Sequence, residues 1–220
     1  MDLSHPVRSL VPSLAGDVLG VLTGTATAMG VSQIARLAPR GTRMGISAVL
    51  TRLVDHGLVL AEPANQGFVY RLNPDHLMTP LVRAAAAMRT TLLDRLTERL
   101  TALRPAPIHA SVFGSFARAE AGVDSDIDLL IVGTSQPDVD DWEVQLDALG
   151  NDVLRWTGNR CQILPLTRTR VRRLRTTGEP IVDNWLDDGH LLAGVPLADL
   201  LDERHRSTTA ATRATQGARR

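Results

Sequence analysis

The chain has 220 residues, a hydrophobic content of 44% and a charged content of 22%, which provides apolar material for one large domain or two small ones. The formal net charge is zero, so no overall field favours an acidic or a basic partner. The single cysteine, Cys161, excludes an internal disulfide and a cysteine-based zinc site. Because the sequence has neither a long apolar run nor a signal-peptide pattern, we expect a soluble, cytoplasmic protein with no membrane partner.

The charges cancel overall but are distributed unevenly along the chain. All 24 basic residues are arginines. Residues 1–76 have 6 arginines and 5 acidic residues, whereas residues 107–166 have 3 arginines and 10 acidic residues. A local acidic excess is typical of a cation-binding site, although a solvated acidic face has the same composition.

The first part of the chain has the pattern of a small helical domain with a hairpin. Apolar periodicity predicts helices over residues 13–23, 31–38 and 42–56. Gly57 ends the third helix, and two short strands follow around the turn Pro-Ala-Asn-Gln-Gly. Three helices and a hairpin within about seventy residues indicate a winged helix-turn-helix domain, which we assign to residues 1–76.

The segment QIARLAPRGTRMGISAVLTRLVDHGLVLAE, followed by YRLNPDH, resembles bacterial winged-helix transcription regulators of the MarR and ArsR type. The resemblance implies double-stranded DNA as a partner, with the helix from Thr42 to His56 in the major groove. Arg40, Arg43 and Ser47 are then expected on its exposed early part, and Arg52 as a further phosphate contact. Solvated side chains, dimerisation and protein contact are the alternative interpretations of this surface.

A long helix is predicted to connect the two halves, over residues 77–106. It begins at Thr79-Pro80, and Pro105 and Pro107 end it. One apolar stripe runs along it, formed by Leu81, Ala85, Met88, Leu92, Leu96, Leu100 and Leu103. Such a stripe packs on a neighbouring domain or on a second copy, so a homodimer is one interpretation.

Strands alternate with helices beyond Pro107, which predicts an α/β (α+β) domain with a mixed sheet and flanking helices. We assign this domain to residues 107–195. Strands are expected over residues 108–113, 127–132 and 160–166, and helices over residues 139–156, 167–175 and 179–188. Residues 196–220 are expected to form a C-terminal tail, disordered from about residue 207.

The stretch FGSFARAEAGVDSDIDLLIV carries the clearest chemistry in the sequence. Glycine followed by serine after a strand allows close approach of a phosphate, because glycine has no side chain and nearby amides and the hydroxyl donate hydrogen bonds. Asp126 and Asp128 alternate by two, so both point to one face of an extended segment. Two carboxylates beside phosphate donors are suited to Mg²⁺ that bridges a nucleoside triphosphate (NTP).

Gly114-Ser115, ten intervening residues and Asp126-Ile127-Asp128 resemble the signature of DNA polymerase β-type nucleotidyltransferases. The longer string is similar to the minimal nucleotidyltransferases, which are often paired with HEPN toxins, and the resemblance covers residues 108–195. It implies that Gly114 and Ser115 hold the triphosphate, and that Asp126 and Asp128 are catalytic and bind Mg²⁺ or Mn²⁺. Arg118 could approach the phosphates or pair with Glu120 or Asp124.

Two positions depart from that family, and the first is Ala119, which replaces the family's glycine after Arg118. Active members carry a third carboxylate on the strand after the long helix, and Gln162 occupies that position here. A glutamine side chain is neutral and cannot serve as a general base. No aspartate or glutamate lies between Thr157 and Gly178.

The sequence therefore predicts a DNA-binding transcription regulator with a nucleotidyltransferase domain that binds Mg-NTP. Three hypotheses remain open: nucleotidyl transfer to an unknown acceptor, NTP sensing without transfer, and an antitoxin-like role beside a HEPN-type toxin. The identity of the acceptor and the nucleotide preference are not specified by any residue pattern.

Overall fold

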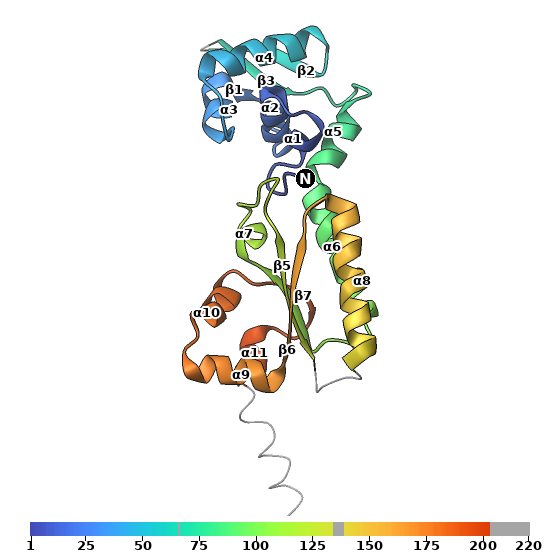
Figure 1. Cartoon of the computed structure of the whole chain (residues 1–220). Helices are drawn as coiled ribbons and strands as arrows, with labels where there is room; N and C mark the ends of the chain where they lie inside the picture. The colour runs from blue at the N-terminus through green and yellow to red at the C-terminus, as the bar shows by residue number, and fades with distance from the viewer. Residues whose placement is uncertain (66, 134–138, 203–220) are drawn as a thin grey trace, which may run out of the picture. The chain divides into compact units, whose positions relative to one another are not determined.

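The computed structural model describes residues 1–65, 67–133 and 139–202, and the chain divides into two compact units (Figure 1). The N-terminal unit comprises residues 1–92, and the C-terminal unit begins at Leu93. Among the described residues, no helix has the length and the apolar content needed to cross a membrane. The predicted disorder from residue 207 lies outside the described residues.

Helices and a small antiparallel sheet form the N-terminal unit. The strand order is β1-β3-β2, and β2 and β3 pair as a hairpin. The short strand β1 is absent from the sequence prediction, and its residues Met29 and Gly30 pair with Tyr70 and Val69 of β3. The elements are α1 (Val7–Leu10), α2 (Leu14–Thr23), β1 (Met29–Gly30), α3 (Val31–Leu37), α4 (Arg43–Asp55), β2 (Val59–Ala64), β3 (Gly67–Leu72) and α5 (Thr79–Ala86).

Helix α4 illustrates how the sequence specifies this unit. Thr42 is its N-cap, and the threonine hydroxyl accepts a hydrogen bond from the amide of Gly45. One face of the helix is buried through Ile46, Val49, Leu50 and Leu53. The helix ends before Gly57, which has a φ of +72° that an L-residue adopts only at a cost. The predicted helix over residues 42–56 is thus confirmed to within one residue at each end.

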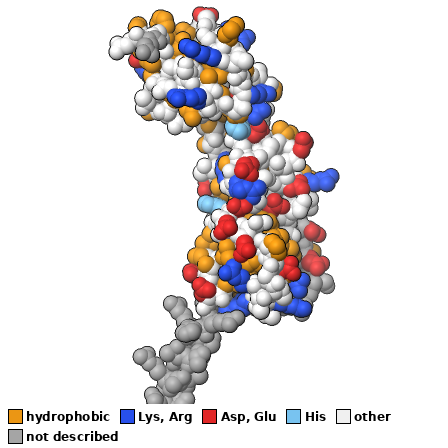
Figure 2. Space-filling view, turned by 90° about the vertical axis from the view of Figure 1, so that its left-hand side faces the viewer, with side chains coloured by type: hydrophobic (Ala, Val, Ile, Leu, Met, Phe, Trp, Pro, Cys, Tyr) orange, Lys and Arg blue, Asp and Glu red, His pale blue; other side chains and the backbone are white. Residues whose placement is uncertain are grey.

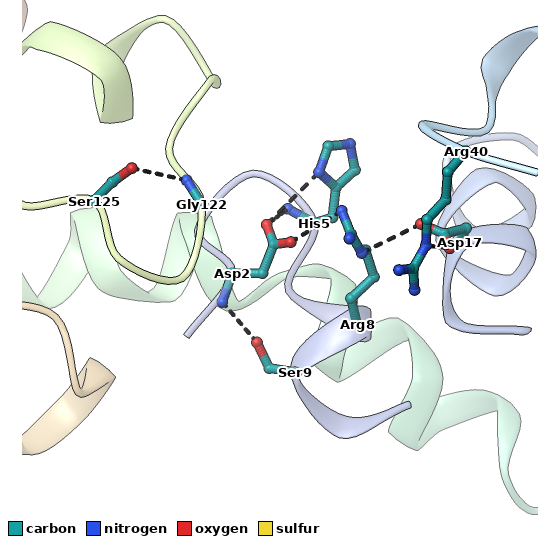
Figure 3. A network of polar contacts seen from close by, with 8 residues as sticks. All are labelled: Asp2, His5, Arg8, Ser9, Asp17, Arg40, Gly122 and Ser125. Atoms are coloured by element: carbon teal, nitrogen blue, oxygen red, sulfur yellow. Dashed lines mark hydrogen bonds and ion pairs between the residues drawn. The ribbon is translucent and has the colours of Figure 1, made fainter. Parts of the chain in front are cut away.

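A buried carboxylate connects the helical segments of the N-terminal unit (Figure 3). The side chain of Asp17 is fully buried, and it pairs with Arg8 Nε at 3.3 Å and with Arg40 Nε at 2.7 Å. Arg8 also pairs with Asp2 through Nη1 at 3.1 Å. Because an unpaired buried carboxylate is expensive, the two guanidinium groups compensate for the burial of Asp17.

Removing the charge of Asp17 is expected to destabilise the N-terminal unit. In Asp17→Asn, Arg8 and Arg40 lose an ionised partner but remain partly exposed to water, so we expect a loss of about 2 kcal/mol in the free energy of unfolding. Urea unfolding measures the loss. Asp75→Asn is the matched control, because Asp75 is exposed and its substitution should change stability by less than about 0.5 kcal/mol. Equal stability of the two variants would contradict a structural role for the network.

A four-stranded mixed sheet forms the centre of the C-terminal unit. Its order is β6-β5-β4-β7, in which β5 and β6 are parallel and the other pairs antiparallel. Helix α6 (Met88–Ala102) leads into this unit. The other elements are β4 (His109–Phe113), α7 (Gly114–Ala117), β5 (Ile127–Gly133), α8 (Val139–Thr157), β6 (Cys161–Thr167), α9 (Arg168–Thr177), α10 (Pro180–Asp187), β7 (His190–Gly194) and α11 (Leu197–Asp202).

Helices cover both faces of this sheet, with α6 and α8 on one side and α9, α10 and α11 on the other (Figure 1). Leu130 and Val132 of β5 pack in one cluster with Val171 of α9, Trp185 of α10 and Leu200 of α11. Side chains alternate along a strand, so Asp128 lies on the same face of β5 as Leu130 and Val132. The acidic motif therefore lies on the sheet face that α9, α10 and α11 cover.

The structure also differs from the predicted elements along the connecting helix and beyond the last predicted helix. The connecting helix is interrupted at Ala87 between α5 and α6, although the amides of Ala87 and Thr91 continue the helical hydrogen bonding. In its stripe Leu81 and Met88 are exposed, whereas Leu92, Leu96, Leu100 and Leu103 are buried within the chain, so the stripe gives no argument for a second copy. Strand β7 and helix α11 are additional, and Leu197 and Leu200 of α11 are buried in the assigned tail.

Candidate functional site

Three chain segments meet at one end of the C-terminal sheet. Strand β4 ends at Phe113, which pairs with Asp128 of β5. Asp128 in turn pairs with Gln162 of β6 in the parallel register. The beginning of α7, the beginning of β5 and the beginning of β6 therefore lie together, so the Gly-Ser turn and the acidic pair of the sequence motif are brought to one place.

Gly114 and Asp128 are in close contact. Gly114 has a φ of +71°, and a Cβ atom at this position would lie 2.6 Å from Oδ2 of Asp128. The backbone conformation therefore disfavours a side chain, and an added Cβ would have to displace the carboxylate of Asp128. The close contact with Asp128 explains why the motif has glycine at position 114. The backbone of Gly114 therefore lies beside the carboxylate without an intervening side chain.

The carboxylates of Asp126 and Asp128 create a local excess of negative charge. Both residues are half-buried. Burial raises the pKa of Asp128, and the charge of Asp126 raises it further. Burial and the same two carboxylates raise the pKa of the Cys161 thiol to about 12, so this thiol stays protonated at neutral pH.

The donor set of this site fits a divalent cation of the Mg²⁺ or Mn²⁺ type. Such a cation is held by one or two carboxylates together with substrate phosphates, rather than by a complete cage of side chains. Asp126 and Asp128 supply the carboxylates, and the absence of a side chain at Gly114 brings its backbone up to the carboxylate of Asp128. Within the described ranges, no cluster of three or more histidine, cysteine, aspartate or glutamate side chains is arranged to bind a metal.

Gln162 lies directly against the acidic pair. Its amide Nε2 donates a hydrogen bond to Oδ2 of Asp126 over 2.5 Å. The resemblance to nucleotidyltransferases implies a third carboxylate at position 162. Gln162 instead has an amide there, which contacts the carboxylate of Asp126.

Ser115 and Arg118 lie on the segment that follows Gly114. Ser115 is half-buried, and its carbonyl accepts a hydrogen bond from the amide of Glu120. Arg118 is exposed and pairs with Glu120 at 2.8 Å and with Asp188 at 2.5 Å. The hydrogen bonds to these two carboxylates raise the pKa of the Arg118 guanidinium. The pairing with Glu120 was one of the two interpretations of Arg118, and Asp188 is a partner that the sequence does not indicate.

The expected DNA contacts lie in different environments in the N-terminal unit. Arg43 and Arg52 of α4 are exposed, whereas Ser47 is half-buried, contrary to the expected exposure. Arg40 precedes the helix, and its guanidinium is paired with the buried Asp17. Met44 is 85% exposed beside Arg43 and was absent from the predicted site.

Asn159 contacts the loop that leads to Asp126, and no functional role was predicted for it. It is 3% exposed, and its amide reaches the loop before Asp126. The Gly-Asn pair after a long helix is a common helix end, so the sequence offers no signal for this contact.

Substituting Gly114 tests the close approach to Asp128. Gly114→Ala is expected to lower the free energy of unfolding by about 1–3 kcal/mol, because it strains the backbone and drives Cβ into the carboxylate. Gly122→Ala is the matched control, since its φ lies outside the left-handed region and no atom lies within 4 Å of the added Cβ. Urea unfolding compares the two variants. Equal effects would rule out a special requirement for glycine at position 114.

Part of the chain is similar to a known protein family. Residues 93–186 match the family model described as "Nucleotidyltransferase domain". No curated protein matches the chain. A crystal structure of a toxin-antitoxin with AMP-PNP has 15% identity and a TM-score of 0.34, covering 58% of this chain and 89% of that chain. TrmBL2, an archaeal chromatin protein with a novel mode of DNA binding, has 14% identity and a TM-score of 0.30, covering 83% and 77%. The C-terminal half of the chain contains a nucleotidyltransferase domain.

Proposed function

We propose that the C-terminal unit binds an NTP through a divalent cation. The observation that supports this most strongly is the contact between Gly114 and Asp128, with Asp126 two residues earlier, directly before β5. Bare backbone for a phosphate and two carboxylates for a cation lie within one small region. Burial and the charge of Asp126 raise the pKa of Asp128, and a bound positive ion relieves the repulsion between the two carboxylates.

Each residue has a defined role in this proposal. Asp126 and Asp128 hold Mg²⁺ or Mn²⁺, and Gly114 and Ser115 hold the triphosphate through backbone amides and the serine hydroxyl. A bound cation neutralises phosphate charge. Arg118 contacts the phosphates only after its guanidinium leaves the carboxylates of Glu120 and Asp188.

Gln162 favours nucleotide binding over efficient transfer. Its side chain contacts Asp126 but cannot accept the proton of an attacking hydroxyl. Within the described residues, no third carboxylate joins the pair in a metal-binding cluster. We therefore propose that Mg-NTP acts here as an effector. Nucleotide binding to the C-terminal unit then changes the behaviour of the rest of the chain.

Neutralising either carboxylate is expected to abolish cation-dependent nucleotide binding. Asp126→Asn and Asp128→Asn should each weaken the binding of a non-hydrolysable NTP by at least tenfold in the presence of Mn²⁺, because each removes one charged ligand. Calorimetric titration with analogues of ATP, CTP, GTP and UTP measures the affinity. Asp124→Asn is the matched control, since Asp124 is exposed two residues before Asp126. An unchanged affinity in the Asp126 and Asp128 variants would overturn the proposal.

We further propose that the N-terminal unit is a winged helix-turn-helix domain that binds double-stranded DNA. Helices α2, α3 and α4 precede the hairpin of β2 and β3, and Arg43 and Arg52 of α4 are both exposed. This arrangement supports α4 as the helix that enters the major groove. On the visible face of the N-terminal unit, arginine side chains lie among apolar and uncharged atoms without forming a continuous basic surface (Figure 2).

Arg43 is expected to contribute to DNA affinity without contributing to stability. Arg43→Ala should weaken binding to a mixed-sequence duplex severalfold. It should also reduce the slope of log K against the logarithm of the salt concentration by about one, because one phosphate contact is lost. Fluorescence anisotropy over a range of salt concentrations measures both quantities. Arg83→Ala is the control, since Arg83 is an exposed arginine on α5. The same loss in both variants would indicate a general charge effect and contradict α4 as the binding helix.

A further inference from the structure

Asn159 connects the end of α8 to the loop that carries the acidic motif. Its Nδ2 atom donates hydrogen bonds to the carbonyl of Val123 at 2.9 Å and to the carbonyl of Ser125 at 3.0 Å. Ser125 is the residue directly before Asp126. A single amide group thus contacts the loop twice, from a position 34 residues further along the chain.

The side chain of Asn159 is held in place by the end of α8. Gly158 has a φ of +76° and turns the chain after the helix. The hydroxyl of Thr157 donates to the carbonyl of Val153 at 2.8 Å and accepts from the amide of Asn159 at 3.0 Å. Thr157 and Asn159 are both buried. The amide group of Asn159 is therefore presented from a fixed backbone position.

Besides Asn159, the hydrogen bond from Gln162 holds this loop at Asp126, but two of the loop's other side chains do not anchor it. Val123 is 62% exposed and Asp124 is also exposed, so neither packs into the core. Within the loop, the amide of Gly122 donates to Oγ of Ser125 at 2.9 Å (Figure 3). Directly after it, the amide of Ile127 donates to the carbonyl of Arg160 at 2.9 Å. Two neighbouring residues, Asn159 and Arg160, thus fix the backbone on both sides of Asp126.

We propose that Asn159 is a positioning residue of the nucleotide site. Asp126 and Asp128 repel one another, so a free loop would let Asp126 move away from the place where a cation needs it. The two hydrogen bonds of Asn159 keep the backbone of Ser125, and with it Asp126, in position before the cation arrives. This preorganisation lowers the cost of binding Mg-NTP. The inference rests on the proposed Mg-NTP site and assigns to Asn159 no contact with the nucleotide.

The test compares Asn159→Ala with a core substitution of similar effect on stability. Val153→Ala is the matched control, because Val153 is a fully buried apolar residue of α8, one turn before Thr157. In calorimetric titration with Mn²⁺ and the tightest-binding non-hydrolysable NTP, Asn159→Ala should weaken binding about tenfold. Val153→Ala should change it less than about twofold, even where its melting temperature falls as far.

Hydrogen exchange of the loop amides gives a second readout. In Asn159→Ala the amides of residues 122–126 should exchange at least tenfold faster, whereas in Val153→Ala they should keep the exchange rate of the unmodified chain. Asn159→Ser replaces Asn159→Ala if the alanine variant does not fold, because serine is too short to reach both carbonyls.

The outcomes separate this inference from the proposed function. If the unmodified chain binds no Mn²⁺-NTP, the proposed nucleotide site is wrong and the positioning role is wrong with it. If the unmodified chain binds but the Asn159 variants bind within twofold of it, only the positioning role is overturned. Equal losses in the Asn159 variants and Val153→Ala would also overturn it, because the effect would then be one of general stability.

Discussion

The contact between the backbone of Gly114 and the carboxylate of Asp128 is the constraint on which the candidate site depends. It favours a residue without a side chain directly after β4, and it places the Gly-Ser turn against the beginning of β5. The sheet register makes this contact unavoidable, since Phe113 and Asp128 are paired residues of neighbouring strands. Strand pairing thereby places the backbone that we propose binds phosphate beside the carboxylates that we propose bind a cation.

Neutral amides, rather than further charges, surround the acidic pair. Gln162 donates to the carboxylate of Asp126, and Asn159 donates to the backbone before it. Amide donors offset part of the cost of half-burying a carboxylate without supplying a group that accepts a proton. This combination stabilises the candidate site before a ligand arrives and is the basis for the proposal of nucleotide binding without efficient transfer. The carboxylates that do lie nearby, on Glu120 and Asp188, are occupied by Arg118.

Much of the fold follows from local patterns, and the site follows in part. The apolar run after Ile127 and the motif glycine predicted a buried strand and a phosphate turn, and the structure brings them together. The pairing of Arg40 with Asp17 joins residues that are 23 positions apart, and the hydrogen bond of Asn159 to Ser125 joins residues that are 34 positions apart. Neither contact produces a periodic pattern in the sequence. Strand β7 was missed because its apolar run is short and lies between glycines. Long-range polar contacts are thus the features that pattern analysis cannot supply.

A crystal structure with Mg²⁺ and a non-hydrolysable NTP tests the central claim most directly. The account predicts a metal ion bound by the carboxylates of Asp126 and Asp128, with the triphosphate along the backbone of Gly114 and Ser115. The Asn159 hydrogen bonds to the loop should be unchanged from those described above. A triphosphate bound elsewhere, or a site between Asp126 and Asp128 that stays empty at saturating Mg²⁺ and nucleotide, would contradict the account.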